Sequence, residues 1–368
     1  MLGAEELTAV GRVFDSRWLG QGQETRAFEE ALRRHLGVPH VVAVSSGTAA
    51  LHLALEALAL PRGSGVLVPS LTFVATIQAI LAAGLRPVFC EVDPSTLQLD
   101  LADAATRAAA SDVRVVMPVH FGGDSCNLAS LRALADEWRL TIVEDAAHAF
   151  GSTCDGIPLG AMGDIGCFSF DPIKNITCGE GGAVVTRSAS LADHVRAARM
   201  LGISSDGWSR HSSSAAWAYT VHAPGWRCHM PDLNAAIGLA QLERLPVLRA
   251  RKQAIVRRYH EAFARLPSLT RLTRPSPEIF PFTYTVRVPA ERRNDLMDRL
   301  RASGIGTSVE YIPNHLHPAF AAWASHLPMT ERVFDQIVSL PLYAELTDDD
   351  VTRVIEAVAG ILGPGDHS

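Results

Sequence analysis

The first half of the chain alternates short apolar runs with segments of helical periodicity. Residues 40–44 form an apolar run typical of a strand, and residues 48–59 place Leu51, Leu55 and Leu58 on one face of a helix. Further strands are expected at 66–68, 87–90, 113–119 and 141–144, and further helices at 73–83 and 128–138. This βαβα order predicts an α/β fold with a mostly parallel sheet that is covered by helices on both faces.

The pattern changes after about residue 186. A helix is expected at 191–200, a polar loop at 202–224, and a long helix at 232–259 that Pro246 interrupts. A stretch rich in Pro and Thr follows, and then a strand at 283–288, a helix at 292–303, a strand at 307–311 and two C-terminal helices. We therefore predict a large domain, residues 1–245, and a smaller C-terminal α+β domain, residues 246–368.

Composition narrows the class of protein. The 368 residues are 48% apolar, which is enough to fill one large core and a smaller one. The net charge is −6 and no basic block occurs, so nucleic acid is not an expected partner. The N-terminus lacks a secretory signal pattern, and no apolar run reaches the roughly 18 residues of a membrane helix, which predicts a cytoplasmic protein without a membrane segment. Six scattered cysteines predict free thiols rather than disulfides or zinc ligands.

The segment CFSFDPIKNITCGEGGAVVT, residues 167–186, is the strongest candidate for chemistry. Lys174 stands alone among small and apolar residues, so its amine is poorly solvated and is able to form a Schiff base with an aldehyde. Ser169 lies five positions before it and a Gly-rich turn follows, which suits a phosphate. Lysine and phosphate together indicate pyridoxal phosphate. Taken alone, the segment fits equally well with a buried strand, a surface lysine and a hairpin.

Three other segments fall where strand ends meet in such a sheet. In SSGTAALHLAL, from Ser45, the helix N-terminus and the Thr48 hydroxyl suit a phosphate, or form an ordinary N-cap. In PSLTFVAT, Phe73 opens a helix, where its ring lies either on a ligand or in the core. In VEDAAHAFG, Asp145 and His148 are three positions apart and can share one face of a turn, where an acid at the strand end either keeps a pyridine nitrogen protonated or serves as a cap or in an ion pair.

These segments, in this order and spacing, resemble the DegT/StrS aminotransferases, which aminate keto-sugars on nucleotide carriers. The resemblance runs from about Ser16 to the C-terminus and includes RPVFCEVDPSTLQLD, VMPVHFGG, PDLNAAIGLAQLERL, GIGTSVEYIPNHLHP and SLPLY. KNITCGEGG and the long loop are most similar to the branch that acts at sugar carbon 4. The resemblance implies an aspartate-aminotransferase-like fold (fold type I), the cofactor pyridoxal 5'-phosphate, and a homodimer with shared active sites.

The resemblance also assigns roles to individual residues. Lys174 is the implied Schiff-base lysine, Asp145 pairs with the pyridinium nitrogen, and His148 lies near the ring hydroxyl. The remaining implied cofactor contacts are Phe73, which stacks on the ring, and Gly47, Thr48 and Ser169, which hold the phosphate.

Three positions depart from the family pattern. His229, in GWRCHM, stands where the family has an asparagine that reaches the phosphate of the other subunit, and a histidine can still donate there. Glu310, in SVEY, replaces a histidine, and FPFT at 280–283 replaces HAWH, both at expected substrate contacts. Arg210 and His317 complete the predicted substrate-binding residues. No metal is predicted, because HLHP occurs in family members that need none.

The predicted function is therefore a transaminase that converts a nucleotide-linked 4-keto-6-deoxy sugar to the amino sugar, with glutamate as the donor. A cyclitol ketone of antibiotic biosynthesis is an alternative substrate. A regulatory protein without activity is an alternative class, which an intact Lys174 and Asp145 oppose. Lys174 also opposes the 3-dehydratase branch of the family, which has histidine at this position.

Overall fold

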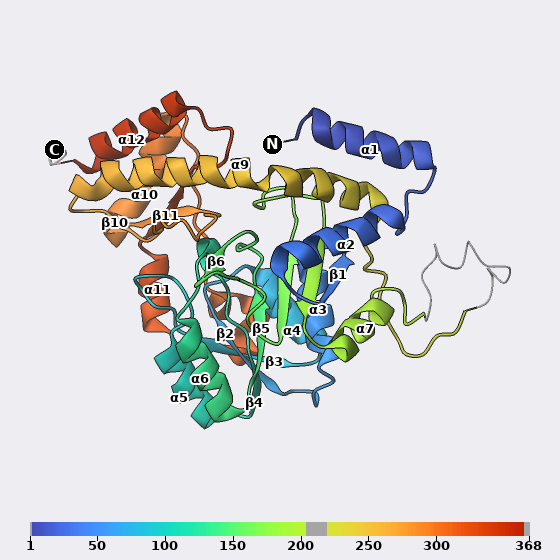
Figure 1. Ribbon diagram of the computed structural model, residues 1–368. Coiled ribbons are helices and arrows are strands. Elements are labelled where there is room, and N and C mark those ends of the chain that lie inside the picture. The colour runs from blue at the N-terminus through green and yellow to red at the C-terminus, as the bar shows by residue number, and fades with distance from the viewer. Residues whose placement is uncertain (1, 204–218, 364–368) are drawn as a thin grey trace.

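A seven-stranded sheet forms the centre of the computed structural model, which describes residues 2–203 and 219–363 (Figure 1). Its strands, in spatial order, are β1 (His40–Val44), β9 (Gly182–Thr186), β8 (Ile165–Ser169), β5 (Thr141–Asp145), β4 (Val113–Val116), β2 (Gly65–Pro69) and β3 (Arg86–Cys90). Only β9 runs antiparallel to its neighbours. The predicted α/β class with a mostly parallel sheet is confirmed.

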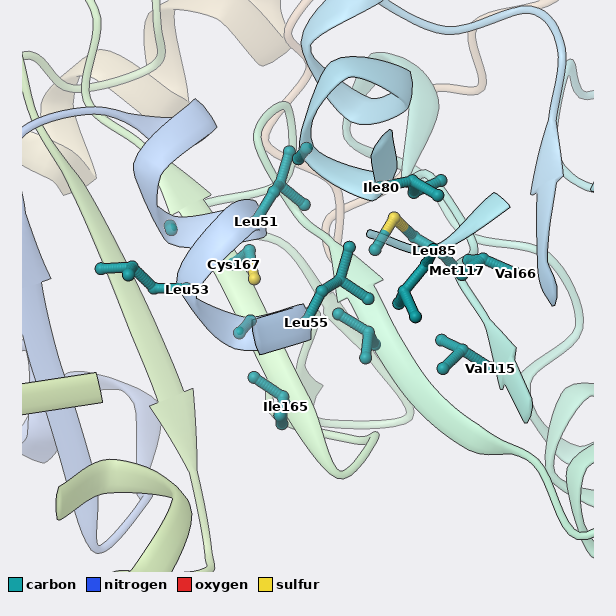
Figure 2. Packing of buried hydrophobic residues seen from close by; sticks show 14 of the residues in the cluster. Leu51, Leu53, Leu55, Val66, Ile80, Leu85, Val115, Met117, Ile165 and Cys167 are labelled. Carbon is teal, nitrogen blue, oxygen red and sulfur yellow. The ribbon is translucent and has the colours of Figure 1, made fainter. Parts of the chain in front are cut away.

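Helices cover both faces of this sheet. One face packs against α3 (Gly47–Ala57), α4 (Val74–Ala82) and α7 (Ala189–Ala198). The other packs against α2 (Gln23–Leu36), α5 (Leu101–Ala110), α6 (Leu128–Trp138) and α9 (Asp232–Ala262). Both faces are covered because apolar side chains point to both sides of each strand. In β1, Val42 and Val44 join the core beneath α3, α4 and α7, and Val41 and Ala43 join the core on the opposite face. Figure 2 shows Leu51 and Leu55 of α3 over Ile165 and Cys167 of β8.

The long helix α9 differs from the prediction. It is continuous over 31 residues, with Pro246 inside it, and it links the sheet to the C-terminal region (Figure 1). Pro246 is exposed while Leu245 and Leu248 are buried, so water can satisfy the carbonyl group that loses its helical partner. None of the helices formed by the described residues is long and apolar enough to be a membrane span.

The C-terminal region has its own core, formed by the second half of α9 and the elements around a small sheet. That sheet has the order β10 (Thr270–Arg271), β11 (Tyr284–Arg287), β12 (Ile337–Leu340), and its helices are α10 (Ala290–Ala302) and α12 (Asp348–Leu362). The remaining elements are α1 (Ala4–Ser16), α11 (Pro328–Phe334), the hairpin strands β6 (Thr153–Cys154) and β7 (Ile157–Pro158), and short 3-10 turns. The predicted domain boundary at residue 245 falls inside α9, and the two-domain division stays a prediction.

The strand predicted at 307–311 is wrong. Ser308 makes a single bridge to Ser339 of β12, after which the chain leaves the sheet. The hydroxyl groups of both serines donate to the Glu310 carboxylate, and Asn314 donates to the backbone oxygens of Ser70 and Thr72. The Ser339 bond keeps Glu310 beside β12, whereas the Asn314 bonds direct the chain that follows toward the carboxyl ends of the large sheet.

Candidate active site

The carboxyl ends of the parallel strands open into a cavity of about 210 Å³. The structure brings seven of the eight predicted cofactor residues together in its lining: Gly47, Thr48, Phe73, Asp145, His148, Ser169 and Lys174. Each of them follows or ends a strand of the sheet or opens the helix after it, so strand order alone accounts for their meeting.

The amino end of α3 forms one wall of the cavity. Ser46 caps the helix by accepting a hydrogen bond from the Ala49 N–H at 3.1 Å, and the first N–H groups of a helix have no partner within it. A Cβ atom on Gly47 would lie 2.7 Å from the Ser169 Cβ, so only glycine allows the helix to approach β8 this closely. Backbone N–H groups with the Thr48 and Ser169 hydroxyls therefore make a cradle suited to phosphate.

Asp145 ends β5 as a buried carboxylate. Its described hydrogen bonds come from neutral donors, the Thr76 hydroxyl at 2.7 Å and the Ala147 N–H at 3.1 Å. Burial therefore dominates and raises the pKa of Asp145, although these bonds and the Lys174 charge act in the opposite direction. A protonated ring nitrogen is the kind of positive group that this environment favours.

His148 is buried one turn further on. Its ring stacks on Phe282 with centroids 4.0 Å apart, and its Nε2 lies 3.0 Å from the Tyr311 hydroxyl. Burial, with the positive charges of Lys174 and Lys252, holds the pKa of His148 well below its usual value. The imidazole is therefore neutral at physiological pH and able to exchange hydrogen bonds with hydroxyl groups.

Lys174 lies half-buried in the loop after β8, where its N–H bonds the Asp171 carbonyl. Its Nζ lies 4.6 Å from the centre of the Phe282 ring. Burial lowers the pKa of Lys174, while the carboxylates of Asp145, Asp171 and Glu310 oppose this. The site thus contains an amine that is easier to deprotonate than a surface lysine, as nucleophilic chemistry requires.

Three other predicted site residues, His229, Glu310 and His317, are not among the residues that line the cavity. The backbone of His229 bridges Val44, and His229 itself is half-buried. Glu310 is half-buried and accepts hydrogen bonds from Ser308 and Ser339, while the His317 ring packs edge-on against Phe320. Arg210 lies outside the described residues.

The structure also gives contacts in the site to three residues for which the sequence predicted no individual role. Thr76 supplies the hydroxyl on Asp145, Tyr311 the hydroxyl on His148, and Phe282 the ring between His148 and Lys174. Thr76 stands one turn after Phe73, so the same motif contained a signal for it. Phe282 and Tyr311 belong to FPFT and SVEY, which were expected at substrate contacts, but no local pattern predicts their contacts with His148 and Lys174.

These features fit pyridoxal phosphate. The cradle at Gly47, Thr48 and Ser169 suits its phosphate, the Asp145 carboxylate suits its ring nitrogen, and the Lys174 amine suits its aldehyde. The chemistry available to the site is therefore that of amine exchange and proton transfer at the carbon beside the amine.

The DegT/DnrJ/EryC1/StrS aminotransferase family matches residues 1–359 of the chain. The spore coat polysaccharide biosynthesis protein SpsC from Bacillus subtilis (strain 168) is 37% identical over 385 aligned positions, covering 100% of this chain and 96% of that protein. The aminotransferase TlmJ from Streptoalloteichus hindustanus has a TM-score of 0.92 and 36% identity, with 98% and 97% of the two chains covered. Spr1654 from Streptococcus pneumoniae, in its PMP form, has a TM-score of 0.92 and 28% identity, with 98% and 97% covered.

The similar proteins and the cavity indicate the same chemistry. The solved neighbours are aminotransferases of fold type I, which confirms the predicted fold type, and Spr1654 has been solved in both PMP and PLP forms. The family as a whole implies pyridoxal phosphate. The chain belongs to the DegT/DnrJ/EryC1/StrS aminotransferase family and is an aminotransferase.

Proposed function

We propose that this aminotransferase holds pyridoxal 5'-phosphate through Lys174 and converts a nucleotide-linked 4-keto-6-deoxy sugar to its amino sugar, with glutamate as the amino donor. The observation that carries the cofactor assignment is the meeting of Lys174, Asp145 and the phosphate cradle in one cavity. SpsC is named for polysaccharide biosynthesis, which supports a sugar as the substrate class. The nucleotide carrier, carbon 4 and glutamate rest on the resemblance of the sequence motifs.

When bound, the cofactor bonds covalently to an amine and withdraws electrons from the carbon that bears it. Lys174 anchors the cofactor and, once released, its Nζ accepts and returns a proton, which its lowered pKa permits. The Asp145 carboxylate stabilises positive charge at the ring nitrogen, and the neutral His148 orients the ring hydroxyl. Gly47, Thr48 and Ser169 bind the phosphate, and Phe73, which is 52% exposed, is available to cover the ring.

The proposed substrate-binding residues differ in the hydrogen bonds that their side chains can form. Glu310 accepts hydrogen bonds only, where a neutral histidine would also donate one, so it favours a sugar hydroxyl as donor. Glu310 would have to exchange a serine partner for that hydroxyl. Arg210 suits the pyrophosphate of a nucleotide carrier, because its guanidinium binds phosphate oxygens in pairs. His317 completes the proposed set.

We also propose a homodimer in which His229 of one subunit reaches the cofactor phosphate of the other. His229 is only half-buried, and its Nδ1 has no hydrogen-bond partner among the described residues. Mixing Lys174→Ala with His229→Ala subunits tests the sharing. Partial recovery of activity is expected in mixed dimers, because one of the two sites then contains both residues. Recovery that stays absent although mixed dimers form contradicts it.

Reduction of the purified protein with borohydride in the presence of pyridoxal phosphate tests the cofactor assignment. Mass spectrometry should locate the added mass on Lys174, and Lys174→Ala should lose both the added mass and turnover. Lys252→Ala is unsuitable as the control, since Lys252 is buried beside the site, so an exposed residue such as Arg257→Ala is preferred. A modified lysine elsewhere, or transamination by Lys174→Ala, contradicts the assignment.

Turnover of nucleotide-linked keto-sugars should then be compared with that of free keto-cyclitols such as scyllo-inosose. We expect the nucleotide-linked substrates to react faster and Arg210→Ala to raise their KM. Efficient reaction of the free cyclitols, together with an Arg210→Ala enzyme that behaves as wild type, would replace the nucleotide-sugar assignment with the cyclitol alternative.

A further inference from the structure

A second lysine is buried beside the candidate active site. Lys252, on α9, is 6% exposed, although it lies in a segment, RARKQAIVRRY, whose other basic side chains reach solvent at least in part. Its Nζ donates to the Asn175 Oδ1 at 2.9 Å and to the Phe282 carbonyl oxygen at 3.4 Å. Both of these acceptors are neutral. Burying an ammonium group on neutral acceptors costs free energy, so the arrangement needs another reason than stability.

The two acceptors connect Lys252 to the reactive lysine. Asn175 follows Lys174 directly in the chain, and Phe282 has the ring that lies 4.6 Å from the Lys174 Nζ and stacks on His148. The Lys252 Nζ donates to the amide oxygen of Asn175, so this oxygen points toward Lys252. The amide nitrogen of Asn175 then faces the Phe280 carbonyl oxygen and donates to it at 3.0 Å.

These bonds tie α9, the Lys174 loop and the segment 280–282 into one unit. We propose that Lys252 is a positioning residue for transamination, because the hydrogen bonds of its Nζ to Asn175 and to the Phe282 carbonyl set where the Phe282 ring lies relative to Lys174 and His148. The inference rests on the proposed function of Lys174. Lys252 is not among the residues that line the cavity, so it acts through the position of the Phe282 ring beside the Lys174 amine.

The electrostatics of the unit agree with this role. Burial lowers the pKa of Lys252 to about 7, against the opposing charge of Glu345. Lys252 and Lys174 both lower the pKa of His148. The carboxylates of Asp145, Asp171 and Glu310 raise the pKa of Lys174. The burial to which the Phe282 ring contributes lowers that pKa and has to outweigh the three carboxylates.

The test follows Lys174 in the cofactor-free protein, which gives a readout independent of turnover. Only an unprotonated amine reacts with an acetylating reagent, so the labelling of Lys174, read by mass spectrometry over a range of pH, reports its pKa. In Lys252→Met the Phe282 ring is freed and a positive charge is lost, and both changes favour a protonated Lys174. We expect the labelling midpoint to move to higher pH by about one unit.

Two further variants separate positioning from charge. Asn175→Ala removes the link but keeps Lys252, and it should move the midpoint in the same direction, with the double variant shifting it less than the sum. Arg257→Met, an exposed residue on the same helix, should leave the midpoint unchanged. A wild-type midpoint in Asn175→Ala, whatever Lys252→Met does, overturns the proposal, since Lys252 would then act by charge alone or not at all.

Turnover provides the second readout. A misplaced reactive group costs up to about 100-fold in rate, so kcat of Lys252→Met should fall between tenfold and that limit while KM for the amino donor stays unchanged. Methionine has a similar length and no charge, so the variant is expected to fold, and Asn175→Ala carries the same test if it does not. Borohydride trapping on Lys174 stays separate, because its failure contradicts the cofactor assignment and leaves the labelling result intact.

Discussion

Two neighbouring carboxylates at the end of β5, Glu144 and Asp145, have opposite environments. Glu144 faces the side of the sheet away from the cavity, where it accepts from the His120 ring at 2.7 Å and from the N–H groups of Gly160, Met162 and Gly163 at 2.6 to 2.9 Å. These bonds outweigh burial and lower its pKa. The Glu144 carboxylate thus has a structural role, because its hydrogen bonds join β5 to the loop before β8.

Asp145 faces the cavity and has two bonds from neutral donors, so burial prevails and raises its pKa. Two acids adjacent in sequence and similarly buried therefore differ in what their surroundings supply. A buried charge whose bonds are complete stabilises a structure, whereas one that is left short of positive partners beside a cavity is suited to a ligand. This difference, rather than burial, separates the structural from the functional carboxylate.

The largest expected effect concerns stability and Glu144. Glu144→Gln places an amide NH₂ group among N–H donors and removes the charge that His120 meets, so the free energy of unfolding should fall by about 3–5 kcal/mol. Urea denaturation measures it, with the exposed Glu137→Gln on α6 as the matched control. A loss below about 1 kcal/mol, the usual limit for an exposed pair, would show that the bonds to Glu144 are dispensable.

The second prediction is that a change at Asp145 lowers activity and leaves stability intact, the reverse of the change at Glu144. Asp145→Asn keeps an acceptor for Thr76 but removes the negative charge, so kcat should fall by about 10²–10³-fold, as when one preorganised electrostatic group is lost. The cofactor-free variant should unfold at no lower urea concentration than wild type, because an unfavourably buried charge is gone. Loss of stability together with activity would make Asp145 a structural residue like Glu144.

The third prediction separates the two acids by the sign of their pH dependence. The folded pKa of Glu144 lies below its usual 4.5, so its stabilising contribution is present above that pH and is lost as the pH falls through the folded value. The folded pKa of Asp145 lies above 3.8, so the folded state holds more protons and stability falls as the pH rises from 3.8 through the folded value.

Unfolding free energies measured from acidic to neutral pH check these signs. As the pH rises, wild type should gain stability relative to Glu144→Gln and lose stability relative to Asp145→Asn. Parallel curves for wild type and Asp145→Asn would mean that the carboxylate titrates alike in the folded and unfolded protein, and the contrast with Glu144 would fail.

The smallest expected effect concerns Tyr311, whose hydroxyl lies 3.0 Å from the Nε2 of the neutral His148. Tyr311→Phe removes one hydrogen bond to His148, worth about 1 kcal/mol, so kcat/KM should fall by no more than about tenfold. The exposed Tyr343→Phe is the control. A fall as large as that of Asp145→Asn would show that Tyr311 takes part in the chemistry itself.

The order of elements in the sequence determined where much of the candidate site lies. Strand runs and helix starts were visible as local periodicity, and in a parallel sheet the carboxyl ends of the strands converge. The sequence is therefore sufficient to group Gly47, Phe73, Asp145 and Lys174. Pro246 and the segment 307–311 could not be interpreted in the same way, because solvent exposure at Pro246 and the bonds of Asn314 to Ser70 and Thr72 override local propensity there.

Which charges are buried and how their partners complete them was decided only by the tertiary structure. A helical pattern places Lys252 on α9 but does not show that Asn175 and Phe282, 77 and 30 positions earlier and later in the chain, enclose it. Likewise VEDAAHAFG contains two acids, and only packing distinguishes Glu144 from Asp145. Desolvation and hydrogen bonding depend on neighbours that are distant in sequence, so the residue types were determined by the sequence and their pKa values by the fold.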